Sequence, residues 1–208
     1  MTDQDARVEA TIAKLVASKS ASESDGIYAE WESYDDDLDR LGYVAPLTCT
    51  RLLVESGIDK QASVLDAGCG TGKVGALLAA EGFNTLHGID YSASMLERAQ
   101  KPGHYVSLAT ADFSDRSTLP RGRYGGIVCV GVFNDSFGSQ FLAGLVDILE
   151  PGASLVFSAR PQFEECAREQ ISRLLDDTLI DSESWQLSDY IREHKSEAWY
   201  VSVRRRID

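Results

Sequence analysis

The sequence predicts one α/β domain built around a doubly wound, mostly parallel β-sheet. Two patterns lead to this prediction. Short apolar stretches alternate with segments whose apolar residues recur at helical spacing, which is the pattern of successive βαβ units. A glycine-rich segment at residues 66–72 connects the first apolar stretch to a helical segment. The length of 208 residues suits a single domain of this class with a full hydrophobic core.

The glycine-rich segment is expected to hold a ligand. It follows a short strand at residues 63–65 and reads Asp66-Ala67-Gly68-Cys69-Gly70-Thr71-Gly72. Its glycines permit backbone angles and a close approach that a Cβ atom would block. The helix that follows has apolar residues at helical spacing, and Gly82 is placed to end it. Because a helix N-terminus offers free N–H donors, a nucleotide-like ligand can lie over such a loop.

A second acidic residue follows at the spacing of a ribose ligand. Residues 86–90 form a short predicted strand that ends in Asp90, 18 residues after Gly72. An acid about 20 residues beyond a glycine loop binds the ribose in dinucleotide-binding proteins. A carboxylate can accept two hydrogen bonds from a vicinal diol. The loop and Asp90 therefore predict a nucleoside-containing cofactor.

The glycine spacing separates two classes of cofactor-binding protein. Dinucleotide enzymes favour G-x-G-x-x-G with the third glycine inside the helix, whereas this chain has G-x-G-x-G at residues 68–72. In this segment the chain resembles the class I S-adenosylmethionine-dependent methyltransferases. Further matches follow in order: Gly88-Ile89-Asp90-Tyr91-Ser92, Ser94-Met95-Leu96 with Ala99, Ala111-Asp112-Phe113, and Leu149-Glu150-Pro151-Gly152-Ala153. Before this core, Tyr34-Asp35 and Gly42-Tyr43-x-x-Pro46 resemble the small Williams–Beuren-region-type methyltransferases.

This resemblance implies a Rossmann-like fold with a seven-stranded sheet, an antiparallel C-terminal hairpin and N-terminal helices. It implies S-adenosylmethionine as the cofactor and S-adenosylhomocysteine as its product. It also implies that Asp112 accepts a hydrogen bond from the adenine amino group, that the Phe113 backbone meets a ring nitrogen, and that Met95 contacts the adenine side. The expected cofactor-binding residues are Asp66, Gly68, Cys69, Gly70, Gly72, Asp90, Tyr91, Met95, Asp112 and Phe113.

The segment before the core is expected to be helical. We predict helices at residues 6–19, 27–41 and 47–55, with a turn at 18–25 and a chain break at Pro46. The acidic run at residues 35–37 is interpreted as a solvated helix surface rather than a metal site. In the family that the chain resembles, N-terminal helices cover the cofactor, so residues 1–58 are expected to form a lid.

The remaining elements complete the alternating pattern. We predict strands at residues 104–111, 126–132 and 153–159, a crossover helix at 137–149, a long amphipathic helix at 163–180 and a hairpin at 185–191 and 198–204. Ser92 or Ser94 can cap the helix after Asp90, and Ser94 with Glu97 suggests a capping box. The domain therefore divides into the lid, a cofactor-binding core at residues 59–160, and a C-terminal helix with hairpin at 161–208.

Composition excludes several kinds of partner. The formal net charge of −13 argues against nucleic acid or an anionic membrane, since both favour lysine and arginine. The four cysteines (Cys49, Cys69, Cys129 and Cys166) have no metal-ligand spacing, so no metal is expected and free thiols in a reducing compartment are predicted. The acidic N-terminus does not resemble a signal peptide, and no stretch approaches the ~20 apolar residues of a membrane span. We therefore predict a cytoplasmic protein. The pattern does not predict its oligomeric state.

The methyl acceptor is defined only weakly by the sequence. Asn134, Asp135 and Arg160 follow predicted strands, at the edge where open α/β sheets bind substrates. Asp135 could accept a proton there, and Arg160 could hold a carboxylate. Tyr43, and less directly Tyr34, are candidates to line the same cavity from the lid.

Direct displacement needs no covalent enzyme intermediate, and the sequence offers no nucleophile–base pair to suggest one. The Asn/Asp-Pro-Pro-aromatic motif of amino-group methyltransferases acting on DNA or glutamine is absent from residues 131–135. A small molecule with an O, N or S acceptor is the leading hypothesis. The alternatives are a protein methyltransferase, a non-catalytic cofactor-binding module and, least favoured, a nicotinamide-dependent oxidoreductase.

Overall fold

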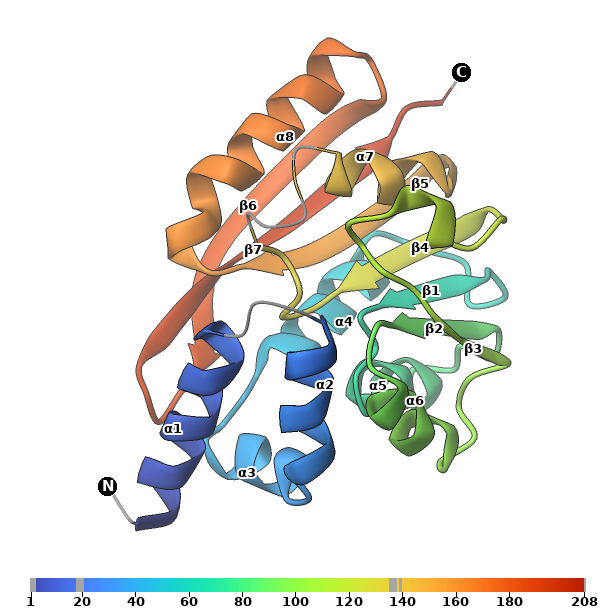
Figure 1. Cartoon of the computed structure of the whole chain (residues 1–208). Coiled ribbons are helices and arrows are strands. Elements are labelled where there is room, and N and C mark those ends of the chain that lie inside the picture. Colours follow the sequence, from blue (N-terminus) through green and yellow to red (C-terminus); the bar gives the residue numbers. More distant parts are fainter. Residues whose placement is uncertain (1–2, 18–20, 135–137, 139, 208) are drawn as a thin grey trace.

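The computed structural model describes residues 3–17, 21–134, 138 and 140–207 and has the predicted α/β fold (Figure 1). One seven-stranded sheet has the order β3-β2-β1-β4-β5-β7-β6. Its strands are β1 (Val64–Ala67), β2 (Leu86–Asp90), β3 (Ser107–Thr110), β4 (Tyr124–Cys129), β5 (Leu149–Ala159), β6 (Ile180–Ile191) and β7 (Ser196–Arg205). Pairs from β3 to β5 are parallel, and β7 is antiparallel to β5 and β6. The predicted parallel sheet with a C-terminal hairpin is confirmed.

Helices cover both faces of the sheet. Helices α4 (Ala45–Glu55) and α5 (Lys73–Ala80) bury one face, where Val64, Val128 and Val156 point. Helices α7 (Phe141–Asp147) and α8 (Glu164–Asp176) bury the other, where the next residue of each strand points. This alternation follows from the two-residue period of a strand. Helix α6 (Ala93–Gln100) contacts β2 and β3, and two 3-10 turns lie at η1 (Arg116–Thr118) and η3 (Pro161–Phe163).

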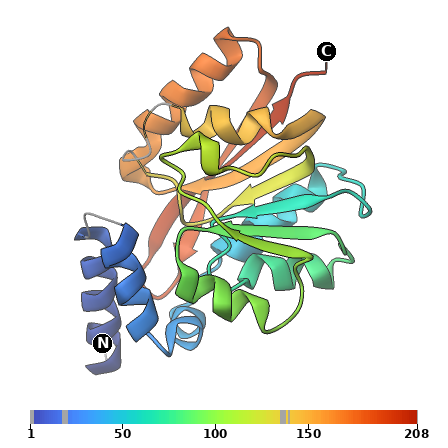
Figure 2. The same cartoon turned by 45° about the vertical axis from the view of Figure 1, so that its right-hand side comes forward.

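Three further helices gather at one end of the molecule. Helices α1 (Asp3–Ala17), α2 (Ala21–Glu30) and α3 (Tyr34–Arg40), coloured blue, lie together and away from α7 and α8 (Figures 1 and 2). Trp31 and Leu41 form a small apolar cluster with Ile191 at the end of β6. The backbone N–H of Val44 donates to the Tyr190 carbonyl at 3.1 Å, which joins this segment to the hairpin. In the described ranges, no helix combines the length and apolar character of a membrane span.

Several predicted boundaries in the N-terminal segment are wrong. The predicted turn at 18–25 is entered by α2, which begins at Ala21, and residues 18–20 lie outside the described residues. The predicted helix at 27–41 is two helices, because the chain turns at residues 31–33. Pro46 does not precede α4 but lies in its first turn, where its missing N–H has no helical acceptor.

Later boundaries differ less. Strand β3 begins at Ser107 rather than 104, and β4 ends at Cys129 rather than 132. Helix α7 is shorter than predicted, residue 137 lies outside the described residues, and Leu149 already belongs to β5. Helix α8 ends at Asp176, and Ile180 begins β6. Ser92, not Ser94, caps α6 by accepting from the Met95 N–H, so the predicted capping box is wrong.

Candidate functional site

The glycine loop between β1 and α5 folds against the end of β2. Gly68, Gly70 and Gly72 have φ values of 82°, 52° and 94°, which L-residues with side chains rarely adopt. The Gly68 N–H donates to the Ile89 carbonyl at 2.7 Å, and the Gly70 N–H donates to Asp90 Oδ2 at 2.9 Å. The loop and the acid that the sequence singled out are therefore in direct contact.

Asp90 is buried at the centre of this arrangement. Its Oδ1 accepts from the Ser92 N–H at 2.9 Å, so each carboxylate oxygen has one backbone donor. Burial raises the pKa of Asp90, and these backbone donors oppose the rise. A carboxylate has about four lone-pair positions. Two remain for a ligand diol, so the observed bonds orient Asp90 without saturating it.

The space beside each glycine differs. A Cβ atom added at Gly68 would lie 2.1 Å from Val132 Cγ2, and one at Gly72 would lie 3.2 Å from the Tyr105 ring. A Cβ added at Gly70 would meet nothing within 4 Å. Gly68 therefore allows the loop to pack against the segment after β4, whereas Gly70 leaves open space above the loop.

Asp66 lies beneath the loop, at 1% exposure. Its Oδ2 accepts from the Tyr105 hydroxyl at 2.6 Å, and that hydroxyl accepts from the Gly75 N–H at 3.2 Å. Its Oδ1 is buried without a hydrogen-bond partner. Burial raises the pKa of Asp66 to about 7; the Tyr105 bond opposes this rise and the charge of Asp90 adds to it. A cationic ligand would supply the favourable interaction that this unpartnered oxygen lacks.

The other predicted cofactor residues surround the same strand ends. Met95 and Cys69 are buried, and Tyr91 is partly exposed beside Asp90. Asp112 is exposed after β3, and its Oδ1 accepts from the Ser114 N–H and hydroxyl at 2.8 and 2.6 Å. The Phe113 ring packs in the core against Phe141, with ring centroids 5.5 Å apart. The Ala111 N–H donates to the Asp90 carbonyl, so the Asp112 segment adjoins Asp90.

The N-terminal helices are attached to this region by carboxylates. Asp25 of α2 accepts hydrogen bonds from the hydroxyls of Ser92 and Ser94. Asp35 of α3 accepts from the Thr71 hydroxyl of the glycine loop at 2.7 Å. Sequence reasoning missed Asp25, since nothing in its neighbourhood marks a partner 67 residues away.

The acidic run of α3 is only partly solvated. Asp37 is buried and accepts from the Trp31 indole N–H at 2.9 Å and the Ser33 hydroxyl at 2.6 Å. Burial is the largest single influence on the pKa of Asp37 and raises it. The hydrogen bonds to its carboxylate together outweigh burial and lower the pKa to about 2. The interpretation of residues 35–37 as a solvated surface is therefore wrong for Asp37, and exposure agrees with it for Asp36.

Aromatic side chains pack between the N-terminal helices and the strand ends. The Tyr28 ring meets Tyr34 with centroids 5.7 Å apart and Tyr91 at 6.4 Å. Burial raises the pKa values of Tyr28 and Tyr34 well above the usual range. Both hydroxyls therefore stay protonated at physiological pH and present neutral, polarisable surface toward Asp90.

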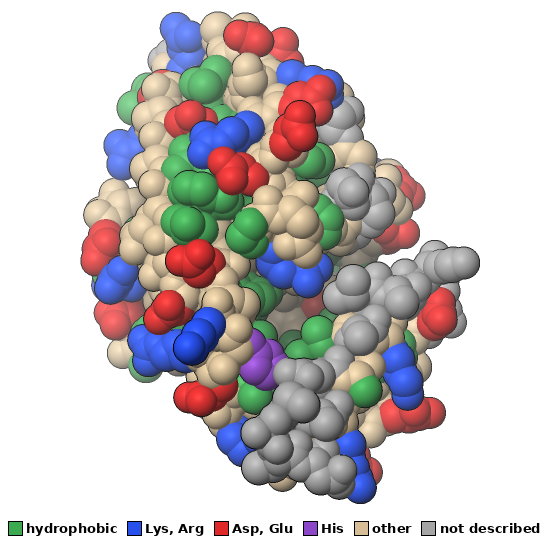
Figure 3. All heavy atoms as spheres, turned by 90° about the vertical axis from the view of Figure 1, so that its left-hand side faces the viewer, with side chains coloured by type: hydrophobic (Ala, Val, Ile, Leu, Met, Phe, Trp, Pro, Cys, Tyr) green, Lys and Arg blue, Asp and Glu red, His purple; other side chains and the backbone are tan. Residues whose placement is uncertain are grey.

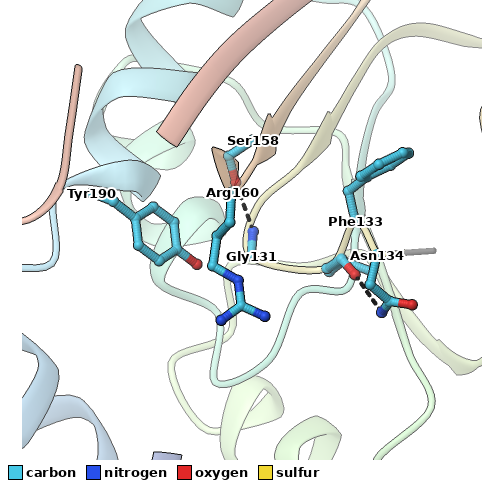
Figure 4. Close-up of a pocket in the computed structure, with 7 residues that line it drawn as sticks. Gly131, Phe133, Asn134, Ser158, Arg160 and Tyr190 are labelled. Carbon is cyan, nitrogen blue, oxygen red and sulfur yellow. Dashed lines mark hydrogen bonds between the residues drawn. The ribbon is translucent and has the colours of Figure 1, made fainter. Parts of the chain in front are cut away.

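A small cavity lies at the ends of β4 and β5 (Figure 4). It has a volume of about 60 Å³ and is lined by Gly131, Val132, Phe133, Asn134, Ser158, Arg160 and Tyr190. The Gly131 N–H donates to the Ser158 hydroxyl at 2.9 Å and ties the two strand ends together. Val132, which contacts Gly68, also lines the cavity, so one residue separates it from the glycine loop. Figure 3 shows a hollow in the molecular surface on the side where the N-terminal helices meet the rest of the chain.

Two of the acceptor-side predictions, Asn134 and Arg160, line this cavity, and a third, Tyr43, lies next to it. The Tyr43 hydroxyl lies 3.5 Å from the Tyr190 hydroxyl, and both approach Gly131. The Arg160 side chain extends beside Tyr190 (Figure 4). Asp135 lies outside the described residues. Sequence reasoning missed Tyr190, because it reads as one residue of an alternating edge strand.

Comparisons with known proteins give one consistent result. A family model described as "Methyltransferase domain" matches residues 64–152. The chain is 32% identical over 156 residues to Methyltransferase-like protein 27 of Homo sapiens, which covers 71% of this chain and 64% of the human protein. The chain thus spans slightly less than two thirds of that relative's length.

Solved structures share the fold. The N-methyltransferase NodS from Bradyrhizobium japonicum WM9, in complex with S-adenosyl-l-homocysteine, superposes with a TM-score of 0.63 at 20% identity over 90% of this chain and 99% of that chain. Magnesium protoporphyrin IX methyltransferase (ChlM) from Synechocystis PCC 6803, with bound SAM, gives 0.58 at 18% identity over 98% of each chain. The family-model match spans the glycine loop and Asp90 and, with the likeness to the human protein, identifies residues 64–152 as a methyltransferase domain; the solved structures show the shared fold.

Proposed function

We propose that this chain binds S-adenosylmethionine over the glycine loop and transfers its methyl group to an O, N or S atom of a small molecule. The observation that carries the proposal is the open space above Gly70 directly beside Asp90. A nucleoside can approach the backbone there and present its ribose to the carboxylate. A cofactor with cationic groups would oppose the raised pKa of Asp66 and favour its carboxylate form, whose Oδ1 has no hydrogen-bond partner in the folded chain.

Most of the predicted contacts have a place in this proposal. Asp90 binds the ribose hydroxyls with its two free lone-pair positions, and Gly68, Gly70 and Gly72 border the methionine and ribose. Asp112 and Phe113, which follow β3, border the adenine next to Asp90, with Met95 behind them. Residues 1–58 serve as the lid, because Asp25 and Asp35 attach it to Ser92 and Thr71.

The chemistry needs alignment more than activation. The cofactor supplies a methyl group on a sulfonium, which a nucleophile can displace directly. The protein must hold the acceptor in line and exclude water. The Gly68–Val132 contact places the glycine loop against the cavity at the ends of β4 and β5. An acceptor anchored in that cavity would therefore face the methionine side of the cofactor.

The cavity limits the size of the group that carries the acceptor atom. A volume of about 60 Å³ admits a group of a few heavy atoms, since one water needs about 10–15 Å³. A small molecule can enter it directly, whereas a protein substrate would have to insert the end of one side chain. A non-catalytic binding module would bind the same cofactor at the same site but would not transfer its methyl group.

Isothermal titration with S-adenosylmethionine, S-adenosylhomocysteine and NAD tests the proposal. We expect the first two to bind and NAD not to bind. Binding of NAD alone would overturn the function and leave only the fold. Cofactor binding with no S-adenosylhomocysteine formation across a broad panel of small acceptors and basic peptides would support the non-catalytic module.

The ribose assignment has its own test. Replacing Asp90 with Asn removes the charge from a two-point hydrogen bond, which is worth about 2 kcal/mol, or about 30-fold in Kd. Asp59→Asn is the matched control, because the Asp59 carboxylate also accepts from a backbone N–H, that of Gln61, but precedes β1. Equal affinity of the Asp90→Asn variant and the wild type would sink the assignment.

A further inference from the structure

The guanidinium of Arg160 is unusually available. Among the described residues it forms no ion pair, and its Cζ lies over the Phe163 ring, 5.3 Å from the ring centroid. Arg116, Arg168 and Arg173 each lie beside a carboxylate. In a chain with a net charge of −13, an arginine at the wall of a cavity that has no acidic partner in the described part of the chain points to a ligand with negative charge.

Tyr190 lines the same cavity, and Tyr43 adjoins it beside Gly131. The oxygens of Tyr43 and Tyr190 would lie 2.8 and 3.1 Å from a Cβ atom at Gly131. They come from the N-terminal segment and from β6, which the Val44–Tyr190 backbone bond holds together. Burial raises the pKa of Tyr190, and the charge of Arg160 opposes part of that rise. Both hydroxyls therefore remain donors beside a fixed positive charge.

We propose that Arg160, Tyr43 and Tyr190 form the subsite for a carboxylate group on the methyl acceptor. This inference rests on the proposed function and narrows it to small carboxylic acids. Arginine presents two parallel N–H donors that match the two oxygens of a carboxylate. Tyrosine O–H groups supply the remaining donors, and a carboxylate fits a cavity of about 60 Å³. Arg160 is thus a specificity-determining residue, not a proton acceptor.

Matched probes test the subsite without knowledge of the acceptor. The protein, saturated with S-adenosylhomocysteine, is titrated with acetate against acetamide and with benzoate against benzamide. Binding is followed by the NMR shift of the Gly131 amide. We expect each carboxylate to bind about ten-fold more tightly than its amide, as loss of a charged hydrogen bond predicts. Arg160→Gln should remove that difference, and Arg160→Lys should retain part of it.

Arg173→Gln is the control, since it removes the same charge from the exposed surface of α8, where Arg173 pairs with Glu169. It should keep the full preference for carboxylates. An equal preference in Arg160→Gln, or no carboxylate binding at all, would overturn the subsite. Tighter binding of inorganic phosphate than of either carboxylate would also overturn it. Failure of S-adenosylhomocysteine to bind would instead refute the proposed function, so the two failures are distinguishable.

Discussion

The two sides of the candidate site are built in different ways. The side beside Asp90 is made mostly of backbone, from the loop at residues 68–72 and the ends of β1 and β2, which are neighbours in the sheet. The side beside Arg160 is made of side chains from the segment after α3, from β5 and from β6. The first is fixed by hydrogen bonds between groups about 20 residues apart, and the second by contacts between Tyr43 and Tyr190, 147 residues apart.

This difference distinguishes the part of the site that suits a widely shared cofactor from the part that sets acceptor specificity. Backbone groups have the same chemistry in every protein, so a site made of them suits a cofactor that many proteins share. Side chains on β5 and β6 can change without disturbing the sheet, so the acceptor side can take a different specificity on the same fold. We therefore expect substitutions near Gly70 to affect cofactor binding, and those near Arg160 to affect only the acceptor.

The largest expected effect is at Gly70. Replacing it with Leu places a side chain in the open space above the loop, and we expect the Kd for S-adenosylhomocysteine to rise by about 100-fold or more. The residue would also adopt a positive φ, which costs about 1–2 kcal/mol of stability. Calorimetric titration and urea unfolding measure the two effects separately.

Gly82→Leu is the matched control for backbone strain. Gly82 follows α5, has a φ of 94° and, like Gly70, would bring a Cβ within 4 Å of nothing. Its variant should lose at least as much stability while binding the cofactor normally. Equal binding by both variants would show that the space above Gly70 is not the cofactor site, and would remove the distinction between the two sides.

The next effect concerns Asp66 and pH. Because burial raises its pKa from 3.8 to about 7, the folded protein holds a proton on Asp66 over a range in which the unfolded chain has lost it. The stability must then fall as pH rises through this range, by about 1.4 kcal/mol per pH unit. Between pH 5 and 6.5 this single group should remove about 2 kcal/mol.

Urea unfolding at several pH values measures this loss. Asp66→Asn keeps an acceptor for the Tyr105 hydroxyl but cannot ionise, so its stability should decline less steeply than that of the wild type over the same range. Asp90, whose pKa is also raised, contributes the same slope to both proteins and cancels in the difference. Parallel curves for wild type and variant would contradict a protonated Asp66 in the folded state.

The sequence predicted the sheet well because strand patterns are local. The central parallel strands contain short buried apolar runs, and glycines mark several of the turns. Helix boundaries failed where tertiary contacts decide them. Ile27, Trp31, Tyr34 and Leu38 keep one helical phase across the break at residues 31–33, so periodicity alone cannot reveal it. At the break, the Trp31 and Ser33 side chains donate hydrogen bonds to the buried Asp37 carboxylate.

The same contrast holds for the site. Asp90 was recognisable because its distance from the glycine loop is set by the length of one βαβ unit. Tyr190 and Asp25 were not, because their partners are set by how the hairpin and the N-terminal helices fold back on the sheet. Arg160 lies between these cases. Its position after β5 suggested an anion ligand, but only the structure brings it beside Tyr190.

The smallest expected effect concerns the attachment of the N-terminal helices to the cofactor side. Asp25 attaches α2 to Ser92 and Ser94 through hydrogen bonds that lower its pKa. The attachment is therefore complete at pH values above the normal carboxyl pKa and weakens as the pH falls through the lowered pKa of Asp25. Asp25→Ala removes the attachment while leaving the loop and Asp90 intact. For a partly exposed carboxylate the loss is about 1 kcal/mol, so we expect dissociation of S-adenosylhomocysteine to become about five-fold faster.

Stopped-flow displacement measures that rate, and limited proteolysis shows whether α2 becomes accessible. Glu30→Ala is the control, because it removes one carboxylate from an exposed position on the same helix. An unchanged dissociation rate together with unchanged proteolysis would mean that the helices pack independently of the cofactor. A faster rate only in Asp25→Ala would show that a side-chain contact controls access to the cofactor side, which is otherwise built from backbone. The two sides of the site would then differ in how they set specificity, but both would depend on side chains.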